Sequence, residues 1–235
     1  MALLRVNGLD VAYGGAQVLF GAGLEVERGE VVALLGRNGA GKSTTLKCVM
    51  GLVRPFSGRI TFDERDITGF DSHVISRLGI GYVPEDRRVF TSLSVAENLE
   101  VGRLATRAGA PQWSVERVFS LFPGLAEIRD RRAGRISGGE QQMLTVARTL
   151  MGNPSLLLLD EPSEGLAPRI VERMAETIAQ LKGEGLAILL AEQNLRFTER
   201  LADRATVIET GGVRWQGPMA DFLGDETAQR AYLSV

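Results

Sequence analysis

The sequence predicts an α/β fold built around a parallel β-sheet, and three apolar segments carry this prediction. Residues 30–36 (EVVALLG) form a short apolar run that leads directly into a glycine-rich segment and then into a helix-compatible stretch. Residues 156–161 (LLLLDE) have no polar face before their last two positions, which is typical of a central strand covered on both sides. Residues 186–192 (LAILLAE) repeat this pattern after a helical segment, so strands and helices alternate.

The other elements follow in chain order. Residues 3–35 contain short runs between glycine-rich turns, with the polar and apolar alternation of half-exposed antiparallel strands. Residues 58–68 and 78–85 continue the strand pattern. Residues 94–151 are helical in pattern and poor in strands, and residues 207–217 predict a β-hairpin. We therefore expect an antiparallel part, a parallel part and an inserted helical part.

The glycine-rich segment GRNGAGKS fits the phosphate-binding pattern G-x-x-x-x-G-K-[ST]. Its glycines can turn successive backbone N–H groups inward, and the following helix adds the positive end of its dipole. Lys42 can reach the β- and γ-phosphates of a nucleoside triphosphate, and the Ser43 hydroxyl can ligate Mg²⁺. The expected phosphate contacts are Gly36, Arg37, Asn38, Gly39, Ala40, Gly41, Lys42, Ser43 and Thr44.

Two acids end the apolar run at 156–161. Ligands of parallel sheets gather at the carboxyl ends of the strands, so these acids reach the phosphates if their strand lies beside the one before the glycine-rich loop. Asp160 would then hold Mg²⁺, directly or through water, and Glu161 would orient and deprotonate the attacking water. The alternative is a solvated acidic turn, which the nearby phosphate-binding pattern disfavours.

A second glycine-rich loop, Ser137-Gly138-Gly139, opens the helix-compatible segment EQQMLTVARTLM and is a second potential anion site. Together with the acids that follow eighteen residues after Gln142, the segment SGGEQ resembles the signature motif of the ABC ATPases. The resemblance implies that Ser137, Gly138, Gly139 and Glu140 contact ATP in trans, on the other subunit of a head-to-tail dimer. It also implies that Tyr13 stacks on adenine; a simple turn residue is the alternative.

The resemblance covers the full chain and implies one ABC nucleotide-binding domain over residues 1–235. In this layout, residues 1–88 and 153–235 form a P-loop NTPase core with an N-terminal antiparallel β subdomain. Residues 89–152 form a helical subdomain that carries the signature motif. The cofactors implied are ATP and Mg²⁺.

Three positions depart from the general family pattern. Glu85 stands where a glutamine is usual; it could approach Mg²⁺ or a catalytic water, but an ionised carboxylate only accepts hydrogen bonds. Gln193 stands at the position of the switch histidine; its amide can donate to a γ-phosphate oxygen but cannot titrate. Ala167 replaces an aspartate of the dimer interface. A degenerate site is the alternative, and the intact Lys42 and Glu161 disfavour it.

The segments VPEDRRVF, PSEGLAP and AEQN resemble the smaller ATP-binding subunit of branched-chain amino-acid importers, a subfamily that also resembles urea, amide and aromatic-acid importers. Glu164 is a charge where that subfamily is usually apolar. The resemblance implies an ATP-hydrolysing importer motor with a second, non-identical ATPase subunit, although a homodimer stays open. It also implies two membrane permease subunits and, indirectly, a periplasmic binding protein. The rival is a soluble ABC ATPase acting on nucleic acid or ribosomes.

Composition bounds these expectations. The net charge of −2 provides no basic field for nucleic acid, and the single cysteine, Cys48, excludes a disulfide within the chain. No apolar run approaches the roughly 20 residues that span a bilayer, and the first residues lack the pattern of an export signal. We therefore expect a cytoplasmic protein that lies on the inner face of the membrane through its permease.

Overall fold

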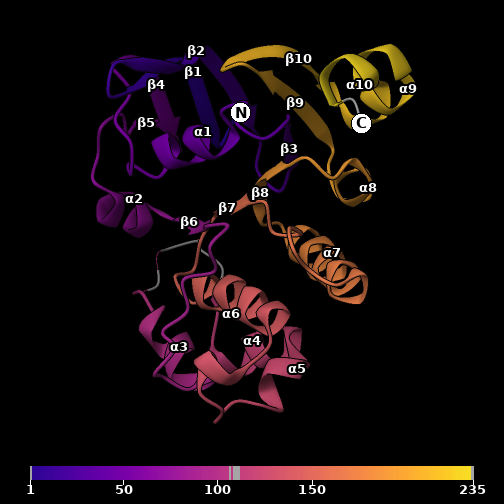
Figure 1. The fold of residues 1–235 in the computed structure, drawn as a ribbon. Coiled ribbons are helices and arrows are strands. Elements are labelled where there is room, and N and C mark those ends of the chain that lie inside the picture. The colour runs from indigo at the N-terminus through magenta and orange to yellow at the C-terminus, as the bar shows by residue number, and fades with distance from the viewer. Residues whose placement is uncertain (1, 106, 108–111, 234–235) are drawn as a thin grey trace.

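The structure, a computed structural model, describes residues 2–105, 107 and 112–233. Its strands form two sheets, one antiparallel with the order β2-β1-β4-β5 and one mixed with the order β10-β9-β3-β8-β7-β6 (Figure 1). The strands are β1 (Leu4–Tyr13), β2 (Ala16–Val26), β3 (Val31–Leu35), β4 (Ser57–Phe62), β5 (Arg65–Asp66), β6 (Ile80–Val83), β7 (Leu156–Asp160), β8 (Ala187–Glu192), β9 (Arg204–Glu209) and β10 (Gly212–Pro218). The helices are α1 (Lys42–Val49), α2 (Ser72–Leu78), α3 (Val95–Val101), α4 (Val115–Leu121), α5 (Pro123–Ala126), α6 (Gly138–Leu150), α7 (Pro168–Gly183), α8 (Leu195–Thr198), α9 (Met219–Gly224) and α10 (Glu226–Leu233), with a 3₁₀ turn at Ala133–Arg135.

The antiparallel sheet confirms the expected half-exposed strands. β1 alternates between buried and exposed residues at its start, and it pairs with β2 from Leu4 opposite Val26 to Tyr13 opposite Ala16. One face of this sheet joins a core that also contains residues of α1, such as Leu46 and Cys48. Burial raises the pKa of the Cys48 thiol to about 12, so this cysteine packs as a small apolar side chain.

The mixed sheet contains the three apolar runs as β3, β7 and β8, and every residue of these strands is buried. Their order in the sheet differs from the simplest expectation, in which β7 would lie directly beside β3. β7 does not pair with β3, because β8 lies between them and pairs in parallel with both. The sequence could not decide this order, since the three runs are equally apolar and carry no signal for a particular neighbour.

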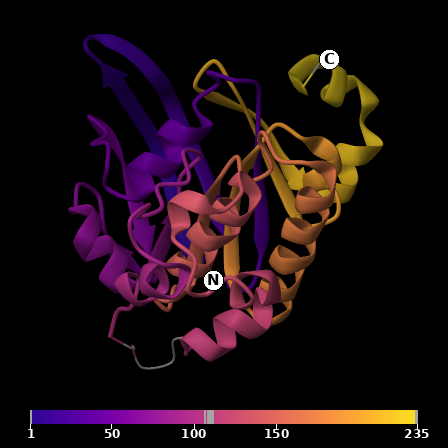
Figure 2. The same ribbon diagram turned by 60° about the horizontal axis from the view of Figure 1, so that its bottom comes forward.

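The helices α3–α6 gather on one side of the mixed sheet, at the bottom of Figure 1, far from the antiparallel sheet. Figure 2 turns this group towards the viewer. Their core is continuous with that of the sheet, because Leu144 and Val146 of α6 share a cluster with Leu157 and Leu159 of β7. The boundaries of the helical subdomain therefore stay a sequence-based prediction.

The predicted hairpin is present as β9 and β10, with Gly212 opposite Glu209. Its turn reaches back to the glycine-rich loop. The backbone N–H of Gly211 donates to the carbonyl of Ala40 at 2.8 Å, and the Phe20 N–H donates to the carbonyl of Gly211 at 2.9 Å. Gly211 has a φ of 77° and a Cβ there would collide with the carbonyl of Val18, so only glycine fits. The turn of the hairpin thus packs against the glycine-rich loop and holds its backbone at Ala40.

Candidate functional site

A cavity of about 290 Å³ opens between the start of α1, the loop after β6 and the loop after β7. Most of the residues expected at the phosphates lie around it. The cavity is lined by Val18, Asn38, Gly39, Gly41, Lys42, Ser43, Thr44, Glu85, Glu161 and Glu164.

The first turn of α1 is open towards this cavity. Its N-cap is Gly41, with a left-handed φ of 114°, and a Cβ at this position would lie 2.6 Å from the Leu19 side chain. No side chain caps the helix and its first turn contains no acidic residue. The N–H groups of this turn and the positive end of the helix dipole are therefore available to an anion.

Lys42 is buried over the loop with three partners. Its Nζ donates to the carbonyls of Gly36 at 2.8 Å and Arg37 at 3.2 Å. The same Nζ lies 2.9 Å from Oε1 of Glu161, and the two side chains are only 3% and 6% exposed. A buried cation of this kind can exchange a carboxylate for a phosphate without moving far, because both present anionic oxygens.

Asp160 faces the loop from the end of β7. Its Oδ1 accepts a hydrogen bond from the Ser43 hydroxyl at 2.8 Å, and its Oδ2 accepts one from the Tyr82 hydroxyl at 2.9 Å. Burial, and then the charge of Asp160, raise the pKa of Tyr82, so its hydroxyl stays protonated and donates. Tyr82 thus orients the carboxylate that faces Ser43.

The donor set at Ser43 and Asp160 suits Mg²⁺, which prefers hard oxygen ligands. Over residues 2–105, 107 and 112–233, no group of three or more histidine, cysteine or acidic side chains could hold a metal ion. Ser43 and Asp160 would hold Mg²⁺ together with phosphate oxygens and water, as is usual for this ion in nucleotide sites.

Glu161 lies at the point where β7 meets the cavity. Its φ of 46° is left-handed, a conformation that costs a non-glycine residue on the order of 1–3 kcal/mol. Its backbone N–H donates to the carbonyl of Ala191 on β8 at 2.9 Å, and the Gln193 amide donates to its Oε2 at 3.5 Å. Strand β8, which lies between β3 and β7 and ends just before Gln193, thus brings Gln193 to Glu161, 32 positions away in the sequence.

Glu164 gives the site a titrating group that the sequence analysis did not anticipate. Its hydrogen bond with Glu161 raises the pKa of Glu164 to about 7, helped by burial and by the charges of Glu161, Glu85 and Glu192. Although Gln193 cannot titrate, the site therefore contains a carboxyl that does so near neutrality.

Glu192 is a second carboxyl that sequence reasoning missed. It is 2% exposed, and burial raises its pKa. Its oxygens accept hydrogen bonds from the backbone N–H groups of Ser163, Gln193 and Asn194 at 3.1 to 3.2 Å. Glu192 thereby ties the loop after β7 to the loop after β8. An acid at the end of an apolar strand was a usable signal, as it was for Glu161.

The remaining predicted site residues are Glu85, Tyr13 and those of the signature motif, and not all of them line the cavity. Glu85 is exposed and lines the cavity directly after β6. Tyr13 is 46% exposed at the end of β1 and does not line the cavity. The signature residues also lie outside it: Ser137 Oγ accepts from the Glu140 N–H at 3.3 Å, and Glu140 Oε2 accepts from the Ser137 N–H at 2.7 Å. The adenine contact and the contacts in trans stay predictions.

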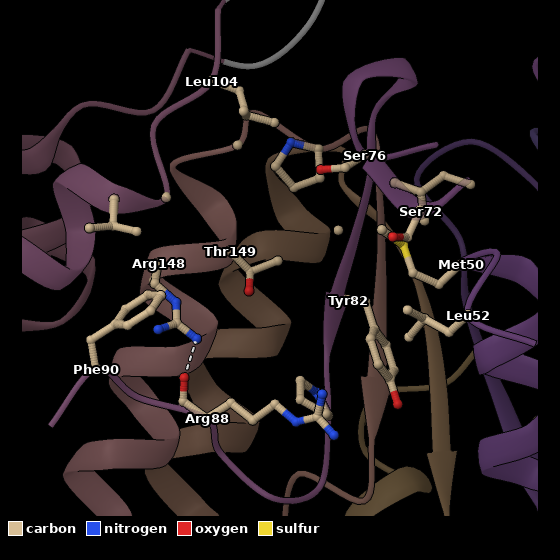
Figure 3. Close-up of a pocket in the computed structure, with 17 residues that line it drawn as sticks. Met50, Leu52, Ser72, Ser76, Tyr82, Arg88, Phe90, Leu104, Arg148 and Thr149 are labelled. Atoms are coloured by element: carbon tan, nitrogen blue, oxygen red, sulfur yellow. Dashed lines mark hydrogen bonds between the residues drawn. The ribbon is translucent and has the colours of Figure 1, made fainter. Parts of the chain in front are cut away.

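A separate groove of about 460 Å³ lies between α2 and β6 on one side and α3 and α6 on the other (Figure 3). Leu52, Phe90 and Val101, each about half exposed, line it. Arg148 lies over the Phe90 ring, 4.9 Å from its centroid, and donates to the backbone carbonyl of Arg88 at 2.8 Å. Large apolar side chains gathered in one groove indicate an interaction surface.

Comparisons with known proteins agree on one family. Residues 19–164 match the family described as ABC transporter. The chain is 44% identical over 231 residues to the high-affinity branched-chain amino acid transport ATP-binding protein BraG of Pseudomonas aeruginosa, which covers 98% of this chain and 99% of the relative. It is 36% identical over 236 residues to the lipopolysaccharide export system ATP-binding protein LptB of Escherichia coli K12, covering 99% and 98%.

Solved structures show the same architecture. The ADP conformation of an ATP-binding cassette of an ABC transporter superposes with a TM-score of 0.84 at 26% identity and covers both chains completely. A nucleotide-free ATP-binding cassette gives a TM-score of 0.83 at 26% identity over 97% of each chain. The family match and the relatives that align over nearly their whole length identify the same family, and the phosphate-binding loop and the paired acids agree with it. The chain therefore belongs to the ABC transporter family and is an ATP-hydrolysing subunit of that family.

Proposed function

We propose that the chain is the motor subunit of an importer for branched-chain or other hydrophobic amino acids. The observation that carries the ATPase part is the set of contacts at one cavity: Lys42 and Glu161, which pair with each other, line it, and so does Ser43, which donates to Asp160. Support for the substrate class comes from the 44% identity to the branched-chain amino acid relative over nearly the whole of both chains. A urea, amide or aromatic-acid importer and a lipopolysaccharide exporter are the alternatives that the experiment below separates.

In the proposed reaction, the open first turn of α1 and Lys42 bind the phosphates of ATP. Lys42 turns from Glu161 to the phosphates, and the freed carboxylate accepts a proton from water. The water oxygen attacks the γ-phosphorus in line, and the bond to the bridging oxygen of ADP breaks. Mg²⁺, held by Ser43 and Asp160, would neutralise phosphate charge when bound. The Gln193 amide, next to Glu161, orients the carboxylate or the γ-phosphate oxygens.

The proposed assembly contains a second ATPase subunit and two permease subunits, with a periplasmic binding protein as an indirect partner. Ala167, an exposed residue before α7, supports a non-identical second subunit because the usual interface acid is missing. In this assembly the permease subunits hold the chain at the membrane. None of the described helices is long and apolar enough to cross a membrane.

The groove of Figure 3 is the proposed contact for a cytoplasmic permease segment with apolar side chains. Phe90→Asp should abolish co-purification with the permease from detergent-solubilised membranes and leave ATP binding by the isolated chain within about twofold. Phe56→Asp is the matched control, since Phe56 is 64% exposed but does not line the groove. Equal loss for both variants would contradict this contact.

The substrate is tested by capturing the intact complex and titrating its binding protein with leucine, isoleucine, valine, urea, an aliphatic amide and phenylalanine. Saturable binding of the branched-chain amino acids supports the proposal. Binding of only urea, amide or aromatic ligands, or co-purification of lipopolysaccharide instead of a binding protein, would assign the chain to another transporter.

A further inference from the structure

The loop between β6 and α3 has an unusual backbone that is held by the helix of the signature motif. Arg87 and Arg88 have left-handed φ values of 59° and 44°, a pair of consecutive non-glycine residues in a disfavoured region. The carbonyl of Arg87 accepts a hydrogen bond from the Thr145 hydroxyl, and the carbonyl of Arg88 accepts one from Arg148 Nη2. Because Thr145 and Arg148 both belong to α6, the position of this loop is coupled to that helix.

This backbone directs the Arg87 guanidinium to the signature loop. A side chain on Gly138 would collide with Nη1 of Arg87, and a Cβ on Gly165 would lie 3.8 Å from its Nη2. In the described part of the chain, no carboxylate forms an ion pair with Arg87, whereas the neighbouring Arg88 pairs with Asp86 at 2.9 Å. Arg87 therefore places an unpaired cation directly on the loop that opens α6.

The start of α6 needs a cation if it is to bind an anion. Its capping box puts the Glu140 carboxylate on the N–H of Ser137 and the Ser137 hydroxyl on the N–H of Glu140, so the first turn carries a negative charge and two backbone donors are occupied. A phosphate approaching Ser137 and Gly138 would meet that charge. A guanidinium on Gly138 offsets it and offers paired donors to phosphate oxygens.

We propose that Arg87 acts in trans, binding the γ-phosphate of the nucleotide held by the second ATPase subunit, beside Ser137 and Gly138. This rests on the proposed function, in which the signature loop faces the nucleotide of the other subunit. The competing interpretation is that Arg87 only holds the loop at Gly138 against the loop at Gly165 in its own chain.

The test measures single-turnover hydrolysis of labelled ATP at one site of the dimer at a time. With Lys42→Ala in this chain, only the second subunit holds ATP. Adding Arg87→Ala to this chain should then slow hydrolysis about tenfold or more, since the removed donor faces the transferring phosphoryl group. When instead the loop lysine of the second subunit is replaced, ATP is held only by this chain, and Arg87→Ala should leave the rate within about twofold.

Further variants separate charge from packing. Arg87→Lys keeps the charge but not the paired donors and should recover part of the rate at the second subunit's site, whereas Arg87→Gln, which keeps much of the packing, should recover none. Arginine and alanine both carry a Cβ, so Arg87→Ala leaves the strain of the left-handed backbone unchanged. Its effect on the rate therefore reports the loss of the guanidinium side chain alone. Arg77→Ala removes an exposed charge on α2 and should change neither rate.

A slow rate at this chain's own site, or full activity of Arg87→Gln at the other site, would overturn the proposal. Absence of hydrolysis in the complexes that retain Arg87 would instead count against the proposed ATPase assembly itself.

Discussion

Two helices of the chain, α1 and α6, begin at glycine-rich loops, and their first turns differ in what closes them. At α1 the N-cap is a left-handed glycine, no side chain caps the turn, and the following lysine lines a cavity. At α6 the N-cap is Ser137, and a capping box with Glu140 satisfies two backbone donors inside the chain. Both segments have the sequence pattern of an anion site, but only one is open in its own chain.

The difference depends on the N-cap, which is Gly41 in α1 and Ser137 in α6, and on the third residue of each helix. Thr44 occupies this position in α1 and leaves the N-cap N–H alone, whereas Glu140 in α6 reaches back to it. A glycine-rich helix start therefore becomes a strong anion site when no acid stands at this position. Where an acid does stand there, anion binding requires a further cation that offsets the negative charge, or a ligand that displaces the carboxylate from the N-cap N–H.

The largest expected effect comes from Glu161→Gln at the α1 site. Turnover should fall about 10²–10⁴-fold because the attacking water loses its base. ATP affinity should stay or increase, since Lys42 no longer has a carboxylate partner. Steady-state hydrolysis and calorimetric titration measure the two effects. Wild-type turnover would exclude Glu161 as the base.

Lys42→Ala tests how much the buried pair of Lys42 and Glu161 contributes to the free energy of unfolding. It leaves Glu161 buried without its partner, which should lower the free energy of unfolding by about 3–5 kcal/mol and abolish ATP binding. The double variant Lys42→Ala/Glu161→Gln should recover most of the stability but none of the binding. Denaturant unfolding and ATP titration of the three proteins check this. A double variant as unstable as the single one would show that the pair does not carry this stability.

Changes at α6 should have smaller effects that are confined to stability in the isolated chain. Ser137→Ala removes the cap and should cost about 0.5–2 kcal/mol. Glu140→Gln retains a capping box and should cost less. Neither should alter ATP affinity of the isolated chain, measured by titration. A tenfold loss of affinity in either variant would mean that α6 contributes to the chain's own site.

The smallest effect concerns pH at Glu164, because this residue is exposed and solvent screens much of its interaction with other charges. Its pKa is raised from 4.5 to about 7 by the hydrogen bond with Glu161, then by partial desolvation and nearby acids. Between these values the folded chain binds a proton that the unfolded chain has released. The associated stability is therefore complete below about pH 4.5 and is lost as the pH rises through 7.

Glu164→Gln should flatten the pH dependence of the thermal midpoint between about pH 4.5 and 7. The control Glu172→Gln, an exposed position on α7, should keep the wild-type slope. Parallel slopes for wild type and Glu164→Gln would show that Glu164 does not retain this proton.

The sequence predicted those parts of the fold in which a pattern determines an element. Strands β3, β7 and β8 were recognisable because burial on both faces requires uniformly apolar residues. Their order was not, since pairing of equally apolar strands depends on the connections between them. At the site, Lys42 and Asp160 lie within known motifs. Tyr82 and Arg87 could not be predicted because each contacts a residue that is distant in the sequence: the Tyr82 hydroxyl donates to Asp160, and the Arg87 guanidinium lies against Gly138.

The support of the glycine-rich loop by the β9–β10 hairpin limits how far the chain can be shortened. All motif residues lie at or before residue 194, and the family match ends at residue 164. Yet the carbonyl of Ala40 is held by the Gly211 N–H, and a Cβ on Gly36 would collide with the carbonyl of Ile208. A fragment that contains every motif but ends before β9 would therefore lack the surface on which the loop rests. We therefore expect the smallest unit able to bind the nucleotide to include the hairpin.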